Sequence, residues 1–287
     1  MEYEGAFYHV TSRGNLRQNI FFQDADREER LETLSRIKER YGRILHAYVL
    51  MNNHYHLLIE TPLANLNQLM QNLNTSYTVY VNRKYQRSGH LFQGRYKAIV
   101  VDKDNYLLTL SRYIHLNPVR ARVAELPEEY QWSSYKEYIG YISTGLVDIR
   151  DTLFHFSENA KEAMAAYRNF VESGIEEDER PFKDVRAGIV LGGEIFFEEK
   201  IKDMITERSV DRELPALRRL LKETPIEQVV RVVADYYKLY PGDNQKVKKM
   251  FQGKKDSHLS VEDCDWREEL HSRNSFWDNP SGSDQYT

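Results

Sequence analysis

The stretch RILHAYVLMNNHYHLLIE, residues 43–60, predicts a β-hairpin. Its two apolar runs, 43–51 and 54–60, each have the length of a strand. Asn52 and Asn53 separate the runs, and asparagine favours a tight turn between antiparallel strands. The hairpin therefore supplies two neighbouring strands of a sheet, and the flanking segments are expected to supply the other strands.

The second strand of this hairpin carries two histidines one residue apart. Successive side chains of a strand point to opposite faces, so His54 and His56 lie on one face and Tyr55 lies on the other. Two imidazoles side by side either share a metal ion or are ordinary half-buried histidines. A further ligand from elsewhere in the chain would distinguish these alternatives.

The segments around the hairpin alternate between strand and helix patterns. Short apolar runs beside turn residues indicate strands, and apolar residues spaced by three and four indicate helices. The order β-α-β-β-α-β, followed by one more helix, is α+β and resembles a ferredoxin-like split βαβ unit, with an antiparallel sheet and helices on one face. The expected strands are 6–12, 43–51, 54–60 and 96–102, and the expected helices are 24–42, 65–85 and about 104–117.

The additional helix offers the further ligand. Tyr113 and Asn117 are four residues apart, so their side chains are neighbours on one helical face, ~6 Å apart along the axis. An amide oxygen together with two imidazoles makes a mixed nitrogen and oxygen site suited to Mg²⁺ or Mn²⁺. Because Pro118 disfavours helical geometry at Asn117, the helix must hold through its last turn to keep the pair aligned, and it is expected to stop there.

The charge of the chain is unevenly distributed. The formal net charge is −4, but residues 83–122 contain nine Lys or Arg and only two Asp. Tyrosine and phenylalanine residues are interleaved with these charges. Basic side chains neutralise phosphates and aromatic faces stack on unpaired bases, so the segment suits single-stranded or hairpin nucleic acid. A solvated basic surface is the alternative.

Other classes of protein are disfavoured by composition. No apolar run approaches the ~18–20 residues that a membrane-spanning helix needs. The N-terminal MEYEGAFYHV lacks the basic and then apolar layout of a signal peptide. Cys264 is the only cysteine, which excludes an intrachain disulfide and a cysteine-rich zinc site. A cytoplasmic protein is expected.

Five motifs occur in an order that resembles a known family. They are HVTSRGN at 9–15, YVLMNNHYHLLIE at 48–60, RSGHLFQGRYKA at 87–98, YIHLNPVRARV at 113–123 and WSSY at 132–135. Together they resemble the REP-associated tyrosine transposases, single-tyrosine HUH endonucleases of the transposase IS200-like superfamily. The resemblance covers roughly residues 3–140. It implies a bacterial, nucleoid-associated protein with an HUH domain in which one helix carries the nucleophile.

The resemblance also implies individual roles. His54 and His56 are the expected metal ligands, Asn117 is the third ligand, and Tyr113 is the nucleophile. The family cleaves single-stranded DNA beside imperfect palindromes and leaves a 5′-phosphotyrosine and a free 3′-hydroxyl. One departure is Tyr55, where a small aliphatic residue is commoner; it should be tolerated because it faces away from the metal.

The expected chemistry agrees with these residue types. A phenol has a pKa of about 10 and is a poor nucleophile at neutral pH, whereas a metal on a phosphate oxygen offsets developing charge. A metal-bound water or a lysine such as Lys103 is a candidate acceptor for the phenolic proton. Tyr106 is the alternative nucleophile, although it lies seven residues from Tyr113. His9 is expected in the core or near DNA, not as a ligand.

Ten residues are predicted to contact DNA. Those in the turn after the first strand are candidate readers of a short guide sequence, and those following the helix end are expected to touch phosphate. The segment 87–96 is interpreted as a DNA-contacting loop, with a bulged entry into the next strand as the alternative. The predicted residues are Arg13, Asn15, Arg83, Lys84, Arg87, His90, Arg95, Lys97, Arg120 and Arg122.

The C-terminal half is expected to be separate from this domain. Residues 1–150 form the predicted HUH domain and 151–184 a helix with an acidic linker. Residues 185–250 are predicted to be a helical appendix that weakly resembles the helix-turn-helix of the DnaA C-terminal domain. Residues 251–287 are polar and expected to be disordered.

Three functions remain open from the sequence. The first is a metal-dependent single-strand DNA nicking and rejoining transposase that acts beside hairpins. The second is a domesticated, non-catalytic hairpin-binding protein, which would not need all four site residues. The third is a relaxase or replication initiator, which usually carries larger helicase or origin-binding regions, and this chain lacks a GxxxxGK[ST] motif. Both a monomer and a homodimer are compatible with the sequence.

Overall fold

The computed structural model describes residues 1–177 and 180–202 of the chain. These residues all lie in the first of two compact units, Met1–Glu223. The predicted tail and most of the predicted helical appendix lie outside the described residues. Within the described ranges, no helix is both long and apolar enough to cross a membrane.

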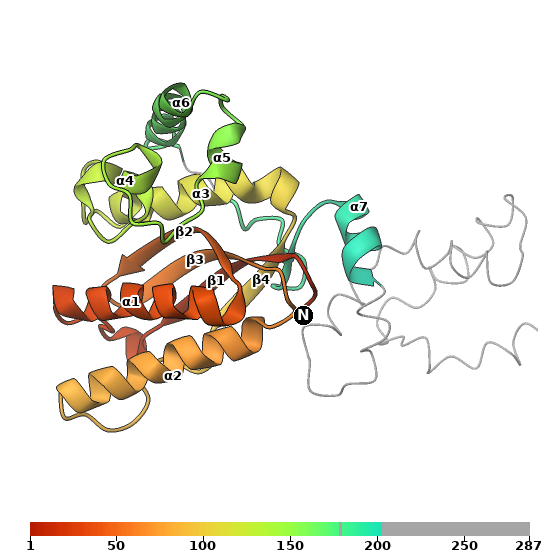
Figure 1. Ribbon diagram of the computed structural model, residues 1–287. Helices are drawn as coiled ribbons and strands as arrows, with labels where there is room; N and C mark the ends of the chain where they lie inside the picture. Colours follow the sequence, from red (N-terminus) through yellow and green to blue (C-terminus); the bar gives the residue numbers. More distant parts are fainter. Residues whose placement is uncertain (178–179, 203–287) are drawn as a thin grey trace, which may run out of the picture. The chain divides into compact units, whose positions relative to one another are not determined.

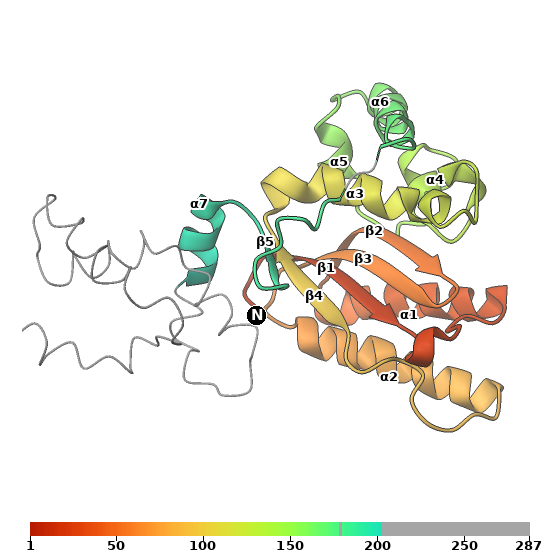
Figure 2. The same ribbon diagram turned by 180° about the vertical axis from the view of Figure 1, so that it is seen from behind.

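A five-stranded sheet forms the centre of the described unit (Figures 1 and 2). Its spatial order is β2-β3-β1-β4-β5. The pairs β2–β3, β3–β1 and β1–β4 are antiparallel, as predicted, whereas β4–β5 is parallel, so the sheet is mixed. The strands are β1 (Ala6–Arg13), β2 (Ile44–Met51), β3 (His54–Thr61), β4 (Lys97–Val101) and β5 (Val190–Leu191).

Strand β5 is a correction to the sequence analysis, which expected a helical segment from residue 185. The backbone N–H groups of Val100 and Asp102 donate hydrogen bonds to the carbonyls of Ile189 and Leu191. Val190 and Leu191 are both fully buried. Two residues are too few to show the alternation by which a strand is recognised in sequence. Beyond β5 follow α7 (Glu194–Phe196) and a short π-helical turn (Phe197–Ile201).

Two long helices, α1 (Asp24–Tyr41) and α2 (Leu66–Lys84), cover one face of the sheet (Figure 1). They bury alternate strand residues such as Tyr8 and Leu57. Helix α1 begins at a capping box between Gln23 and Asp26 and ends at Gly42, whose φ of 64° suits glycine. These helices and the hairpin agree with the patterns in the sequence.

Helix α3 (Lys103–Arg120) lies on the opposite face of the sheet (Figure 2). Leu107, Leu110 and Ile114 pack there against Phe7 and Leu58. The fold is therefore α+β, with two helices on one face and the tyrosine-bearing helix on the other. The sheet face beneath α3 is the face that carries His54 and His56.

The expected end of α3 at Asn117 is wrong. Pro118 lies inside the helix, which continues to Arg120, and the N–H of Ala121 donates to the carbonyl of Asn117. Proline removes one backbone donor. Pro118 and its neighbour Leu116 are buried, and this packing keeps the last turn helical. Tyr113 and Asn117 thus stay in register, as the sequence analysis required.

A further layer packs on the outer side of α3 (Figures 1 and 2). Its core includes Leu116, Tyr138 and Tyr167. The WSSY motif joins this layer to the sheet, because the N–H of Leu50 donates to the carbonyl of Trp132 and that of Tyr48 to the Ser134 hydroxyl. The helices are α4 (Tyr135–Tyr138), α5 (Arg150–Phe154) and α6 (Ala160–Ser173), with 3₁₀ turns at Asn15–Arg17 and Pro127–Glu129.

Candidate metal and nucleophile site

The alternation of β3 separates the histidine pair from Tyr55. His54 and His56 lie with ring centroids 5.1 Å apart. Tyr55 is buried on the opposite face, where its hydroxyl donates to Asn74 Oδ1 at 2.7 Å and the Arg30 guanidinium lies 4.3 Å from its ring. The departure at Tyr55 is accommodated as expected, since its side chain packs under α1 and α2.

Helix α3 brings Tyr113 and Asn117 to the histidines. The Tyr113 ring lies 5.7 Å from the His56 ring and almost perpendicular to it. The Asn117 side chain acts on both residues, because it raises the pKa of His54 and lowers the pKa of Tyr113. The structure therefore gathers the four residues that the sequence analysis selected, two from a strand and two from one turn of a helix.

Both histidines use Nδ1 for a partner inside the protein. Nδ1 of His54 lies 2.6 Å from Asn53 Oδ1, and Nδ1 of His56 lies 2.9 Å from Nε2 of His9. Nε2 is therefore the candidate ligand atom of each ring. Two imidazole nitrogens and the amide oxygen of Asn117 form a donor set that fits a divalent cation such as Mg²⁺ or Mn²⁺.

Electrostatics keep both imidazoles neutral. Burial, followed by the positive charge of Arg13, lowers the pKa of His54, and the bond to Asn117 opposes this shift. Burial also lowers the pKa of His56 well below its ordinary value, and His9, His54 and Arg13 add to the effect. A neutral imidazole has the lone pair that a metal ligand needs.

Two arginines flank the tyrosine. Arg13 pairs with His54 in the register of β1 and β3, and the Arg120 guanidinium lies 5.4 Å from the Tyr113 ring. Burial raises the pKa of Tyr113 above its ordinary value of 10, whereas the Asn117 bond, Arg120 and Arg13 each lower it. The two arginines favour a phenolate and a bound phosphate alike.

The predicted DNA-contacting loop lies beside this site. Gly14 forms a bridge with Phe92, and the N–H of Asn15 donates to the carbonyl of Leu91. The N–H of Gln93 donates to the carbonyl of Arg13. These bonds place the loop that contains His90 against the turn of Arg13 and Asn15. The loop then continues through Arg95 to Lys97, where β4 begins. Arg122 follows the end of α3.

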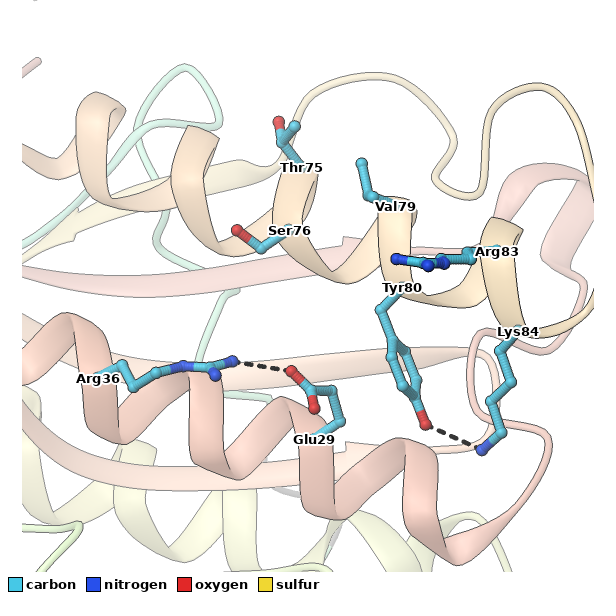
Figure 3. Close-up of a pocket in the computed structure, with 8 residues that line it drawn as sticks. All are labelled: Glu29, Arg36, Thr75, Ser76, Val79, Tyr80, Arg83 and Lys84. Carbon is cyan, nitrogen blue, oxygen red and sulfur yellow. Dashed lines mark hydrogen bonds and ion pairs between the residues drawn. The ribbon is translucent and has the colours of Figure 1, made fainter.

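Three predicted DNA contacts lie elsewhere. Arg83 and Lys84 belong to α2, on the opposite side of the sheet, where they line a pocket between α1 and α2 (Figure 3). Lys84 is already paired with Asp26 Oδ1 at 2.7 Å. Arg87 lies with its guanidinium 5.2 Å from the Phe22 ring. The structure does not bring Arg83 and Lys84 to the histidine pair.

The suggestion that Lys103 accepts the phenolic proton is wrong. Lys103 begins α3, ten residues before Tyr113, which corresponds to ~15 Å of helix. Its ammonium lies 2.7 Å from carboxylate oxygens of both Glu60 and Asp151. Tyr106, the alternative nucleophile, is seven residues from Tyr113, or ~10 Å along the axis.

The cluster around Lys103 is a second group of metal-ligand types. His46, Glu60 and Asp151 offer atoms that all lie within 4.8 Å of one another. Nε2 of His46 is 3.1 Å from the Glu60 carboxylate, which Lys103 also contacts. Because the ammonium already pairs with both carboxylates, the cluster is best described as an ion-paired network.

Two residues at the candidate site were missed or left without a role. Phe182 packs against His9, with ring centroids 4.6 Å apart, and against Tyr113 at 5.1 Å. It belongs to the segment before β5, and nothing near it in the sequence predicts this long-range contact. His9 is buried beside His56 on the neighbouring strand. The sequence signal for this position was that His9 shares a strand face with Phe7.

The structure thus places a helix-borne tyrosine against two strand-borne histidines on an α+β scaffold. Residues 2–117 match the family model described as "Transposase IS200 like". This segment of the chain is therefore similar to the IS200-like transposases, in agreement with the resemblance seen in the motifs.

One of the solved structures that match the chain is described as a REP-associated tyrosine transposase bound to a REP hairpin. It is 15% identical, with a TM-score of 0.43. The similarity covers 52% of this chain and 86% of the other. No curated protein matches the chain.

Proposed function

We propose that the protein is a Mg²⁺- or Mn²⁺-dependent DNA strand transferase that nicks and rejoins single-stranded DNA beside palindromic hairpins. The observation that carries the proposal is the position of the Tyr113 ring, 5.7 Å from the ring of His56, whose own ring lies 5.1 Å from that of His54. The match to the IS200-like transposases supports DNA as the substrate. The reaction proceeds through a 5′-phosphotyrosine.

The ligands in this proposal are Nε2 of His54, Nε2 of His56 and the side-chain oxygen of Asn117. A divalent cation bound there supplies positive charge to a non-bridging oxygen of the scissile phosphate. The protein contributes the orientation of the ligands: β3 fixes the two rings, and the last turn of α3 fixes the amide.

Tyr113 performs the group transfer. Its Oη forms a bond to phosphorus while the bond from phosphorus to the 3′-oxygen breaks, and the leaving oxygen takes a proton to become the 3′-hydroxyl. Arg13 and Arg120 oppose the burial that raises the Tyr113 pKa, and so favour the phenolate. The reverse attack by a 3′-hydroxyl on the phosphotyrosine rejoins strands with no additional energy source.

The groups around the site fit a single strand leading to it. Arg13 and Arg120 lie near the tyrosine, and the loop with His90 is bonded to the turn at Arg13 and Asn15. The arginines neutralise phosphates on either side of the scissile bond. Arg83 and Lys84 play no part in this surface, since they lie across the sheet.

The experiment that tests the function follows the covalent adduct. Hairpin DNA with a single-stranded flank, labelled at either the 5′ or the 3′ end, is incubated with Mg²⁺ or Mn²⁺ and run on a denaturing gel. Only the 3′-side fragment should carry protein. Tyr113→Phe keeps the ring that packs on His56 and Phe182 but removes the hydroxyl, so nicking and adduct should both disappear while hairpin affinity stays.

The matched control is Tyr106→Phe on the same helix, which should retain activity. An adduct that persists in Tyr113→Phe would move the nucleophile to another residue. Hairpin binding without any adduct in the wild-type protein would instead support the non-catalytic binder.

A further inference from the structure

We propose that His9 is a positioning residue that holds His56 in the tautomer able to bind a divalent cation. The inference rests on the proposed function, since it concerns the same metal site. His9 neither touches the substrate nor serves as a ligand in this proposal. It acts through one hydrogen bond to His56.

The first observation is the geometry of the two rings. His9 lies on β1, the strand next to β3, and only 3% of its surface is exposed. Its Nε2 is 2.9 Å from Nδ1 of His56, and the ring planes differ by only 25°. The bond therefore lies close to the plane of both imidazoles, where ring lone pairs and N–H groups point.

The direction of this hydrogen bond determines which nitrogen of each ring carries the proton. A neutral imidazole carries one N–H and one lone pair. If Nε2 of His56 is to hold a cation, its proton must be on Nδ1, and His9 must then accept that proton's hydrogen bond with its own Nε2. The opposite orientation, with His9 as donor, would leave a proton on Nε2 of His56 and block the ligand position.

His54, the other histidine of the pair, also has a hydrogen-bond partner at Nδ1, and there the direction of the bond is fixed. Asn53 uses its Nδ2 to donate to the carbonyl of Arg17, so its Oδ1 faces Nδ1 of His54 as an acceptor. An amide oxygen can only accept, which sets the tautomer of His54. His9 occupies the equivalent position behind His56, and metal-bound histidines generally need such a partner.

Packing keeps His9 in this place. Phe182 lies 4.6 Å from the His9 ring, and Tyr113 lies 6.3 Å from it on the side of α3. Nδ1 of His9 is buried and has no hydrogen-bond partner in the described part of the chain. Burying a polar atom without a partner lowers stability, so the ring is retained there at the expense of folding free energy.

Two substitutions in the full-length protein separate the hydrogen bond from the packing. His9→Gln places an amide oxygen near the position of Nε2 and can still accept from His56. His9→Phe keeps a flat ring against Phe182 but offers no acceptor. Mn²⁺ affinity is measured by electron paramagnetic resonance titration without DNA, and the unfolding temperature is measured without metal.

We expect His9→Phe to weaken Mn²⁺ binding by on the order of 10- to 100-fold, as for other outer partners of metal ligands. His9→Gln should recover most of the affinity, and neither variant should change hairpin binding in the absence of divalent cations. Wild-type Mn²⁺ affinity in His9→Phe would overturn the proposal. Equal loss in both variants would also overturn it, because the acceptor would then be irrelevant.

Nitrogen-15 NMR of ring-labelled histidine reads the tautomer directly. In the wild-type protein with Mg²⁺, His56, assigned by the signal lost in His56→Gln, should be protonated at Nδ1 only. In His9→Phe the fraction of that tautomer should fall. Failure of the proposed function has a different signature: His54→Ala would then bind Mn²⁺ as well as the wild type does.

Discussion

The two ends of helix α3 rest on the same face of the sheet with similar residue types but different consequences. At the N-terminal end, Lys103 meets Glu60 and Asp151, and His46 joins the network. At the C-terminal end, Tyr113 and Asn117 meet His54 and His56. Both ends combine imidazole with oxygen ligands, yet the first also contains a lysine that pairs with the carboxylates.

The two ends differ because the N-terminal end contains its own cation, the ammonium of Lys103. An ammonium 2.7 Å from two carboxylate oxygens already supplies the positive charge that a metal would bring. At the histidine pair, the Nδ1 atoms of His54 and His56 instead contact the uncharged side chains of Asn53 and His9. Ligand type alone therefore does not identify a metal site; the partners already present must be counted.

The largest expected effect compares one histidine from each end. His56→Ala should lower divalent-dependent cleavage on the order of 10³-fold or more, equivalent to about 4 kcal/mol of transition-state stabilisation. His46→Ala should leave the rate near that of the wild type at a temperature where both variants are folded. Single-turnover cleavage of a labelled hairpin substrate measures both. If His46→Ala abolishes cleavage and His56→Ala does not, the metal site lies at the N-terminal end of α3 instead.

The second prediction concerns Lys103. Lys103→Met leaves two partly exposed carboxylates without their cation, and the free energy of unfolding should fall by about 1–3 kcal/mol, between the values for exposed and buried pairs. Mn²⁺ affinity at the histidine pair should not change. Urea denaturation measures the first quantity, and Lys161→Met on α6 is the control for removing an exposed lysine.

A loss of Mn²⁺ affinity in Lys103→Met at an unchanged unfolding temperature would mean that the two ends are coupled. In that case Lys103 would do more than anchor α3.

The third prediction concerns pH. The hydrogen bond from His46, and then Lys103, lowers the pKa of Glu60 from 4.5 to about 2. A lowered carboxyl pKa stabilises the folded state fully above pH 4.5, and this contribution is lost as pH falls toward 2. The free energy of unfolding of the wild type should therefore decline more steeply across this range than that of Glu60→Gln. Parallel curves for the two proteins would exclude Glu60 as the cause.

The smallest expected effect concerns DNA affinity. Arg120→Gln should weaken hairpin binding about fivefold to tenfold, as for one charge-assisted contact of ~1–1.5 kcal/mol. The slope of log affinity against log salt concentration should fall by about 1. Arg83→Gln, across the sheet, should change neither quantity. Equal effects of the two substitutions in a salt titration would place DNA on both faces.

Much of the site was predictable because its rules are local. Strand alternation placed His54 and His56 together and sent Tyr55 away, and helical spacing paired Tyr113 with Asn117. The same spacing excludes Lys103 as a base for Tyr113, since ten residues of helix separate the two. That exclusion was available from the sequence alone.

The rest depends on contacts between distant segments. Pro118 suggested a helix end, but tertiary packing of the last turn outweighed one missing hydrogen bond. Phe182 and β5 reach the site and the sheet from beyond α6, and no local pattern encodes that return. The division of the chain at residue 150 and the roles of residues beyond 202 remain predictions.

The sheet can be completed only late in synthesis, because β5 lies almost ninety residues after β4 in the chain. Val190 packs in the core under α1 and α2, and Leu191 packs in the core under α3, so these two residues close both sides of the sheet at once. Until they leave the ribosome, β4 presents an unpaired edge, of the kind that adds strands from other chains. The segment matched by the transposase family ends at residue 117, but its sheet is complete only after residues 118–191 have followed it.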